Sequence, residues 1–383
     1  MAVVGRRRRS TSLPGVTDQP TPIPELARRA KAASRVLATA STTSKDAALL
    51  AAADLLESRV DDVLSANAAD VAAAQDAGIG AGLVDRLRLD SSRVTAMAGG
   101  LRQVAGLADP VGEVLDGWVR PNGLRISRVR VPLGVVAIIY ESRPNVTSDA
   151  AGLCLKSGNA AFLRGSSTAI HSNTAIASVL REAVAGAGLP EDSVVLVDDV
   201  SREAATEFMQ QRGLVDCLIP RGGPSLIASI LEHATVPFVI DGDGNCHVYV
   251  DATADLAMAE TILVNAKTQR PSVCNAAESL VLHAGIAAEF LARVDAAMPG
   301  VELVGDERAR SMLDRVGPAT AEDFATEFLD LKLSVKVVDS LDEAIAHVNE
   351  HSSGHSEAIV TEDLRSAERF LAQVDAAAVL VNA

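Results

Sequence analysis

The sequence lacks any long apolar run and is short of positive charge. No uninterrupted apolar stretch approaches the ~18 residues that a membrane span requires. Lys and Arg together number 35 against 50 Asp and Glu, which gives a formal net charge of −15 at pH 7. This balance argues against nucleic acid or an anionic membrane as the main partner, and an anionic substrate would need local basic residues.

Cysteine is also scarce, and its spacing excludes the common metal motifs. The histidines are scattered without forming a ligand cluster, so the sequence predicts no metal site. Few, dispersed cysteines fit a reducing compartment, and we expect a cytoplasmic protein. The four cysteines, which include no C-x-x-C pair and no zinc-ligand spacing, are Cys154, Cys217, Cys246 and Cys274.

The chain begins with a segment that is unlike the rest. Residues 1–22 are basic and then rich in Pro, Ser and Thr, and we expect a disordered tail. A secretion signal is disfavoured because no apolar segment follows Arg6–Arg9. Ala-rich helical patterns follow, with Pro24 suited to a helix start and Thr42 or Thr43 to an N-cap. The expected early helices are 25–38, 43–58, 60–76 and 91–105.

From Gly134 onward apolar strands alternate with helices, which indicates an α/β fold with a parallel sheet. A second, smaller α/β unit is expected to begin near His247. The expected strands are 135–140, 160–163, 194–197, 215–219, 236–240, 279–282, 335–338, 358–360 and 378–381. The expected helices are 149–156, 168–187, 202–211, 225–233 and 256–264.

Residues 114–131 have a different pattern, alternating around Asn122-Gly123. Asn-Gly favours the positive φ values of a tight hairpin turn, so a projecting β-hairpin is predicted here.

The segment from Asn265 to Ser279 contains the strongest candidate for a nucleophile. Cys274 lies there between a helical run and a strand-like run, and Pro271 disfavours one continuous helix. A cysteine at such a junction lies near backbone N–H groups that favour the thiolate, and Lys267 and Arg270 add positive charge. Taken alone, a cysteine is more often a buried, inert thiol, and only the motifs described below favour the nucleophile.

Two other junctions between a strand and a helix suit phosphate groups. At the first, Arg164 and Ser166 combine a cation with a hydroxyl at a helix N-terminus, although an ordinary turn and cap is the alternative. At the second, Gly222 and Gly223 would let the backbone approach a pyrophosphate closely. Neither junction matches G-x-G-x-x-G.

Several long motifs occur in a fixed order, namely V-P-L-G-V-V-A-I-I-Y-E-S-R-P-N, S-G-N-A-A-F-L-R-G-S-S, I-P-R-G-G, C-H-V-Y-V-D and K-T-Q-R-P-S-V-C-N. Together they resemble the aldehyde dehydrogenase superfamily, and most closely its branch that acts on L-glutamyl 5-phosphate. The resemblance extends from about Leu26 to Ala383. It implies a Rossmann-type NADP-binding domain over 23–245, a smaller α/β catalytic domain over 246–383, and an oligomerisation arm at 114–131.

The resemblance also implies roles for individual residues. Cys274 would form a thioester with the substrate, and the side chain of Asn145 would stabilise the oxyanion. The implied reaction is the NADPH-dependent reduction of L-glutamyl 5-phosphate to glutamate 5-semialdehyde and phosphate, a step of proline biosynthesis. The resemblance implies that Arg164 binds the 2′-phosphate and that Glu327 binds the nicotinamide ribose of the cofactor. Ser166, Gly222 and Gly223 are expected to bind the cofactor from their own junctions, although the superfamily uses a different cradle at the two glycines. The anionic substrate would be held by Arg143 or Arg270, unless these form structural ion pairs.

Two departures from the family pattern leave alternatives open. Hydrolytic members carry a glutamate before the cysteine, whereas Val239–Asn245 has none, unless Asp241 or Asp243 substitutes. A thioester would then be resolved by phosphate or hydride, while a CoA- or water-using aldehyde dehydrogenase is the second possibility. The branch normally continues past Ala383 with residues that complete the pocket and the oligomerisation sheet, so we expect a weakened homo-oligomer. A non-catalytic partner of a full-length relative or of glutamate kinase is the third possibility.

Overall fold

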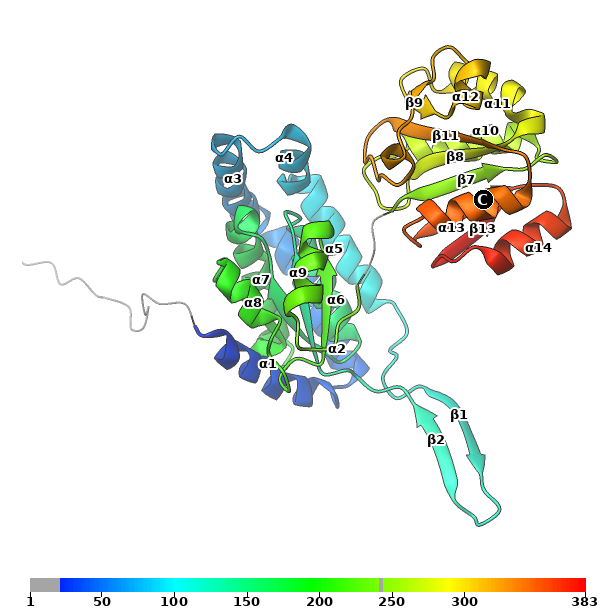
Figure 1. Ribbon diagram of the computed structural model, residues 1–383. Coiled ribbons are helices and arrows are strands. Elements are labelled where there is room, and N and C mark those ends of the chain that lie inside the picture. The colour runs from blue at the N-terminus through cyan, green and yellow to red at the C-terminus, as the bar shows by residue number, and fades with distance from the viewer. Residues whose placement is uncertain (1–20, 241–243) are drawn as a thin grey trace, which may run out of the picture. The chain divides into compact units, whose positions relative to one another are not determined.

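The computed structural model describes residues 21–240 and 244–383, so nearly all of the predicted tail over 1–22 lies outside the described residues. The described chain divides into two compact units (Figure 1). Unit 1 ends at Ile240, and unit 2 comprises the described residues from 244 onward. Each unit is built on its own parallel sheet. Among the described helices, none combines the length and apolar character needed to cross a membrane.

The sheet of unit 1 has the strand order β5-β4-β3-β6. Every residue of its central strand β3 is buried, which is why Val135–Tyr140 is an unbroken apolar run. The register pairs Val135 with Ala160 on one side and Val136 with Cys217 on the other. The strands are β3 (Val135–Tyr140), β4 (Ala160–Arg164), β5 (Val194–Leu196) and β6 (Cys217–Arg221).

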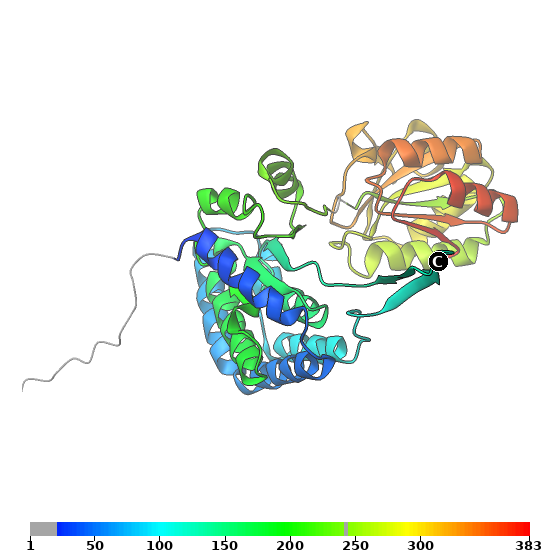
Figure 2. The same cartoon turned by 90° about the horizontal axis from the view of Figure 1, so that it is seen from below.

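Helices cover both faces of this sheet (Figure 2). The right-handed crossovers from β3 to β4 and from β4 to β5 place α6 (Asn145–Lys156) and α7 (Ile170–Gly186) on one face. The helix α1 (Ile23–Leu37) packs against β3, β4 and β5, and it also contacts α8 (Arg202–Phe208). The other helices are α2 (Thr42–Ser58), α3 (Val60–Asp76), α4 (Ala81–Leu87), α5 (Ser91–Ala105) and α9 (Pro224–His233), with short 3-10 turns η1 (Ser167–Ala169) and η2 (Glu191–Ser193).

Most predicted elements of unit 1 are present, but several differ in detail. The strand predicted at 215–219 is Cys217–Arg221, and the helix predicted at 202–211 ends at Phe208. Residues 236–240 form no strand, because Phe238 makes only a single bridge to Leu218 beside Pro237. The N-cap of α2 is Ser41, whose Oγ accepts from the N–H of Ser44, and not Thr42 or Thr43. The helix α6 begins at Asn145, four residues before the predicted start.

The predicted hairpin is confirmed. It consists of β1 (Val114–Val119) and β2 (Arg125–Val129), paired antiparallel, and it projects from the body of unit 1 (Figure 1). Gly123 has φ 86°, which supports the tight turn between the strands. Every residue of β1 is exposed.

The sheet of unit 2 has the order β10-β9-β11-β8-β7-β12-β13 and is parallel throughout its described pairings. Alternate strand residues enter two separate cores. Val248 and Leu280 pack with Phe290, whereas Tyr249 and Val281 pack with residues of α13 and α14. The strands are β7 (Cys246–Val250), β8 (Ala277–His283), β9 (Glu302–Gly305), β10 (Gly317–Pro318), β11 (Lys332–Val338), β12 (Ser356–Val360) and β13 (Ala378–Val381). The helices are α10 (Leu256–Thr268), α11 (Ala284–Ala297), α12 (Glu307–Met312), α13 (Leu341–His351) and α14 (Leu364–Gln373), with η3 at Glu322–Phe324.

Candidate active site

The predicted site residues of unit 1 gather at the carboxyl ends of three neighbouring strands. Arg143 and Asn145 follow β3, Arg164 ends β4 with Ser166 just beyond it, and Gly222 and Gly223 follow β6. The chain proceeds from β3 to β4 and β5 on one side and returns to β6 on the other. Ligands of open parallel sheets bind at such a switch point, outside the carboxyl ends of the strands.

Arg164 is held in a buried setting. The residue is only 8% exposed, and one guanidinium nitrogen, Nη2, donates to the carbonyl of Ser201 at 2.6 Å. The Nε atom is buried and has no hydrogen-bond partner among the described residues. Burial lowers the pKa of the guanidinium, and the nearby Asp199 carboxylate opposes that shift. An unsatisfied buried donor of this kind is costly unless a ligand completes it.

Ser166 belongs to a group of three hydroxyls that join two strand ends. Its Oγ lies 2.6 Å from Oγ1 of Thr168, which in turn lies 2.7 Å from Oγ of Ser142. Ser142 follows β3 and Ser166 follows β4, so the cluster fixes the two loops side by side.

Gly222 and Gly223 pack against Glu141, a residue that the sequence analysis did not assign. The N–H of Gly223 donates to Oε1 of Glu141 at 3.2 Å. A Cβ on Gly222 would lie 2.7 Å from the same oxygen, so a side chain there would displace the carboxylate. Glu141 is part of the Y-E-S-R-P-N motif, but only the fold shows that it supports the glycine turn.

Asn145 is the first residue of α6 and is half-buried. Its side-chain N–H₂ donates to the Asp149 carboxylate at 2.9 Å. Burial raises the pKa of Asp149, and the Asn145 amide opposes that shift. The amide is therefore already oriented as a donor, toward an internal acceptor.

In unit 2, Cys274 lies on an exposed turn between α10 and β8. The backbone of Gly244 runs directly against this turn, since a Cβ on Gly244 would lie 1.6 Å from the Cys274 carbonyl oxygen. The thiol of Cys246 donates to that same carbonyl oxygen, with Sγ 3.3 Å away. Only glycine can be accommodated at 244, and the turn is held through its main chain.

Glu327 reaches the same region. Its Oε1 accepts from the N–H of Gly244 at 3.0 Å. Glu327, the residue predicted to bind the ribose, and the Cys274 turn therefore both contact Gly244. Asn245 anchors this segment further, because its Nδ2 donates to the carbonyls of Phe324 and His351 at 2.8 and 2.7 Å. The candidates Asp241 and Asp243 lie outside the described residues.

The two cations expected beside Cys274 differ in their surroundings. Arg270 is exposed, as a substrate ligand would need to be. Lys267 is completely buried, and its Nζ pairs with Glu278 at 2.6 Å. The expectation that Lys267 contributes free positive charge was therefore wrong, because a buried carboxylate compensates it. Glu278 also accepts from the N–H of Leu329 at 3.2 Å and so connects to the Glu327 segment.

His247 is paired with Glu357. Its Nδ1 lies 3.0 Å from Glu357 Oε2, and both side chains are fully buried. The ring of His247 also packs edge-on against that of His347, with centroids 5.8 Å apart.

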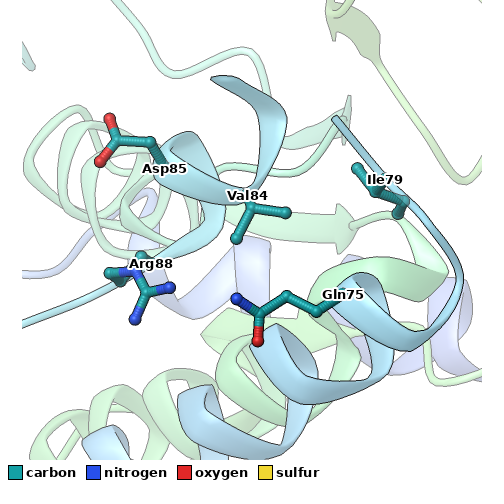
Figure 3. A pocket seen from close by; sticks show the side chains of 5 residues that line it. All are labelled: Gln75, Ile79, Val84, Asp85 and Arg88. Atoms are coloured by element: carbon teal, nitrogen blue, oxygen red, sulfur yellow. The ribbon is translucent and has the colours of Figure 1, made fainter. Parts of the chain in front are cut away.

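A surface pocket of about 420 Å³ lies beside α3 and α4 in unit 1 (Figure 3). None of the predicted site residues lines it. Its walls are Gln75, Ile79, Val84, Asp85 and Arg88.

Known proteins are similar to this chain over most of its length. The model of the aldehyde dehydrogenase family matches residues 17–331 and 333–383. The gamma-glutamyl phosphate reductase of Syntrophomonas wolfei is 53% identical over 361 residues, covering 94% of this chain and 86% of the relative. That of Thermobifida fusca is 52% identical over 370 residues, covering 96% and 88%.

A solved structure agrees with the sequence comparison. The crystal structure of gamma-glutamyl phosphate reductase from Thermotoga maritima superimposes with a TM-score of 0.91 at 46% identity, covering 94% of this chain and 88% of that one. The aldehyde-dehydrogenase-like α/β fold predicted from the sequence is thus confirmed. With these matches over nearly its full length, the chain belongs to the aldehyde dehydrogenase family of oxidoreductases and, within it, to the gamma-glutamyl phosphate reductases.

Proposed function

We propose that this protein reduces L-glutamyl 5-phosphate to L-glutamate 5-semialdehyde and phosphate, with NADPH as reductant, in proline biosynthesis. The observation that carries the proposal is the exposed Cys274 turn beside Gly244 and Glu327, in a chain that is 53% identical to a gamma-glutamyl phosphate reductase.

Cys274 supplies the nucleophile. Its sulfur attacks the acyl carbon of the glutamyl phosphate, a C–S bond forms, and the C–O bond to phosphate breaks. This divides one difficult substitution into two easier steps through a thioester. Asn145 donates a hydrogen bond from its side chain to the substrate oxygen that becomes negative, a type of contact worth about 3 kcal/mol. The amide carries two N–H groups, so one can donate to the substrate oxygen while the other donates to Asp149.

The strand ends of unit 1 fit a dinucleotide with a 2′-phosphate. The buried Arg164 Nε without a partner is a donor that an anion would satisfy, and Ser166 adds a hydroxyl. Gly223 leaves its backbone open to a pyrophosphate, and Gly222 beside it lets the turn pack against Glu141. Glu327 accepts from a ribose hydroxyl in place of the Gly244 N–H. NADPH, when bound, supplies the hydride that converts the thioester to the aldehyde level.

The remaining assignments follow from this proposal. Unit 1 is the NADP-binding domain, unit 2 is the catalytic domain, and the hairpin of β1 and β2 is an oligomerisation arm. Arg270, and Arg143 after β3, are the candidates for the substrate's charged groups, because arginine binds carboxylate and phosphate in a bidentate manner. A biosynthetic enzyme with free thiols at its four cysteines fits the cytoplasm.

The reverse reaction tests the proposal. Purified protein is given glutamate 5-semialdehyde and NADP⁺, and NADPH formation is followed with and without inorganic phosphate. We expect reduction of NADP⁺ only when phosphate is present. Phosphate-independent turnover would indicate hydrolysis of the thioester, and turnover requiring CoA would indicate a CoA-acylating enzyme. No turnover under any condition would favour the non-catalytic alternative, a partner of an active relative or of glutamate kinase.

A further inference from the structure

A second cysteine of unit 2, Cys246, lies against the main chain of the Cys274 turn. Cys246, the first residue of β7, is buried, and its Sγ is 3.3 Å from the carbonyl oxygen of Cys274. Cys274 is exposed on the neighbouring turn. The other two cysteines, Cys154 and Cys217, are buried in unit 1.

The two thiols differ in reactivity. Burial, together with the nearby Glu357 carboxylate, raises the pKa of the Cys246 thiol to about 12, so this thiol stays protonated. It is inert toward oxidants on its own. The exposed Cys274 is the sulfur that a dissolved oxidant meets first.

The geometry brings the inert thiol within reach of the exposed one. Disulfides require Cα atoms roughly 4.4–6.8 Å apart. The Cys246 sulfur already contacts the main chain of Cys274, so the remaining adjustment falls on the side chain and turn of Cys274. That turn lies outside any helix or strand. Within it, the N–H of Val273 donates to the carbonyl of Arg270, and the N–H of Ala276 donates to the carbonyl of Val273.

We propose that Cys246 and Cys274 form an oxidisable thiol pair, in which Cys246 traps a hydroperoxide-oxidised Cys274 as a reversible disulfide. The Cys274 sulfur attacks a peroxide oxygen, the O–O bond breaks, an alcohol or water leaves, and Cys274 becomes a sulfenic acid. The Cys246 sulfur then attacks the Cys274 sulfur, the S–O bond breaks, and the hydroxide leaves with the Cys246 proton as water. Two thiols are oxidised and one hydroperoxide is reduced.

The disulfide protects the exposed sulfur. Without a resolving thiol, a sulfenic acid proceeds to sulfinic acid, which thiols do not reduce. With Cys246 next to it, the oxidised sulfur is held in a form that dithiothreitol restores. This inference depends on the proposed function only where turnover is measured, because the disulfide itself is detected chemically.

The test treats the full chain with limiting hydrogen peroxide, blocks free thiols, and digests it with trypsin without reduction. Lys267 lies between the two cysteines, so cleavage there separates them unless a disulfide joins the peptides. We expect the joined 246–274 peptide in the unaltered chain and in Cys217→Ser, a matched control that removes a buried thiol from unit 1. In Cys246→Ser, which keeps a donor to the Cys274 carbonyl, we expect Cys274 sulfinic acid to rise about threefold or more.

Absence of the joined peptide, with equal sulfinic acid in the unaltered chain and in Cys246→Ser, would overturn the inference. If Cys246→Ser fails to fold, the presence or absence of the joined peptide in the unaltered chain still shows whether the disulfide forms. A joined peptide in a protein without phosphate-dependent turnover would support the thiol pair and contradict only the proposed function.

Discussion

Cys274 is the residue on which the proposed chemistry depends, and its contacts allow a single substitution to isolate it. Gly244 and Cys246 contact its main chain and hold the turn independently of the thiol. We expect Cys274→Ala to abolish reduction while NADPH affinity stays nearly unchanged, because the cofactor residues proposed in unit 1 are untouched. Initial rates and a fluorescence titration with NADPH measure the two effects. Cys154→Ala and Cys217→Ala serve as controls that should stay active, and turnover by Cys274→Ala would contradict the assignment.

We expect Arg164 to set the preference for NADP over NAD, because its buried Nε has no hydrogen-bond partner among the described residues and could donate to the 2′-phosphate. Losing a charge-assisted hydrogen bond to phosphate costs about 1.5–3 kcal/mol. We therefore expect Arg164→Gln to weaken NADP⁺ binding by about ten- to a hundredfold and NAD⁺ binding far less. Calorimetric titration with both nucleotides measures the difference. Arg202→Gln, which removes an arginine at the start of α8, is the control, and equal losses for both nucleotides in Arg164→Gln would exclude a 2′-phosphate contact.

At the scale of elements, the Lys267–Glu278 pair connects the helix before the Cys274 turn to the strand after it. Both side chains are fully buried, and burial raises the pKa of Glu278 to about 7 although Lys267 opposes the shift. Breaking one partner of a buried pair leaves an uncompensated charge and costs about 3–5 kcal/mol, whereas replacing both partners is often neutral. We expect Lys267→Met and Glu278→Leu each to lower the free energy of unfolding by that amount, and the double variant to recover most of it. Urea unfolding measures all three, and additive losses would show that the pair is not coupled.

Three neighbouring histidines of unit 2, His247 on β7 and His347 and His351 on α13, should make its stability depend on pH. Burial, together with the neighbouring His247 and His351, lowers the pKa of His347 from 6.5 to about 3. In the unfolded chain this imidazole takes up a proton below pH 6.5, while in the folded chain it stays neutral down to about pH 3. Stability is therefore lost as the pH falls through this window, by up to about 1.4 kcal/mol per pH unit.

His347→Phe tests this dependence, because it keeps an aromatic ring against Phe324 and His351. The difference in unfolding free energy between the variant and the unaltered chain should shrink or reverse between pH 7 and pH 4. His233→Phe, on the more exposed α9, is the matched control. Parallel pH profiles for His347→Phe and the unaltered chain would contradict the assignment.

The elements also show what the sequence could predict and what it could not. Val135–Tyr140 was predictable because a strand buried on both faces is apolar throughout, and the hairpin because Asn-Gly specifies its turn. The apolar run at 236–240 has a similar composition but forms a single bridge, since partner strands decide such cases. At the site, residues at strand ends such as Arg164 could be predicted, because they belong to motifs that occur in a fixed order along the chain. The contact of Glu141 with the glycine turn could not be predicted, because it joins segments that are distant in the sequence. The pairing of Lys267 with Glu278 could not be predicted either, because it depends on the burial of both side chains.

At the scale of the whole molecule, the net charge of −15 contrasts with the concentration of arginines at the hairpin. Four arginines lie on or beside its strands, and two of them pair with its own acids, Arg128 with Asp116 and Arg130 with Glu113. Large apolar side chains are exposed alongside them. A two-stranded hairpin with open edges and exposed apolar residues is at most marginally stable alone, so it gains stability from a partner strand or surface.

If the hairpin is an oligomerisation arm, its exposed apolar side chains are buried in the assembly. Trp118 is 46% exposed and Val119 is 64% exposed, and as neighbours on one strand they point to opposite faces of the hairpin. We expect Trp118→Lys or Val119→Lys, whichever lies on the covered face, to weaken association at least about tenfold, because a buried unpaired charge costs more than 1.4 kcal/mol. Sedimentation velocity over a dilution series measures this, with Leu107→Lys as an equally charged control at an exposed leucine outside the hairpin. If both hairpin variants and the unaltered chain sediment alike at every concentration, the arm does not mediate assembly, and the exposed β1 needs another explanation.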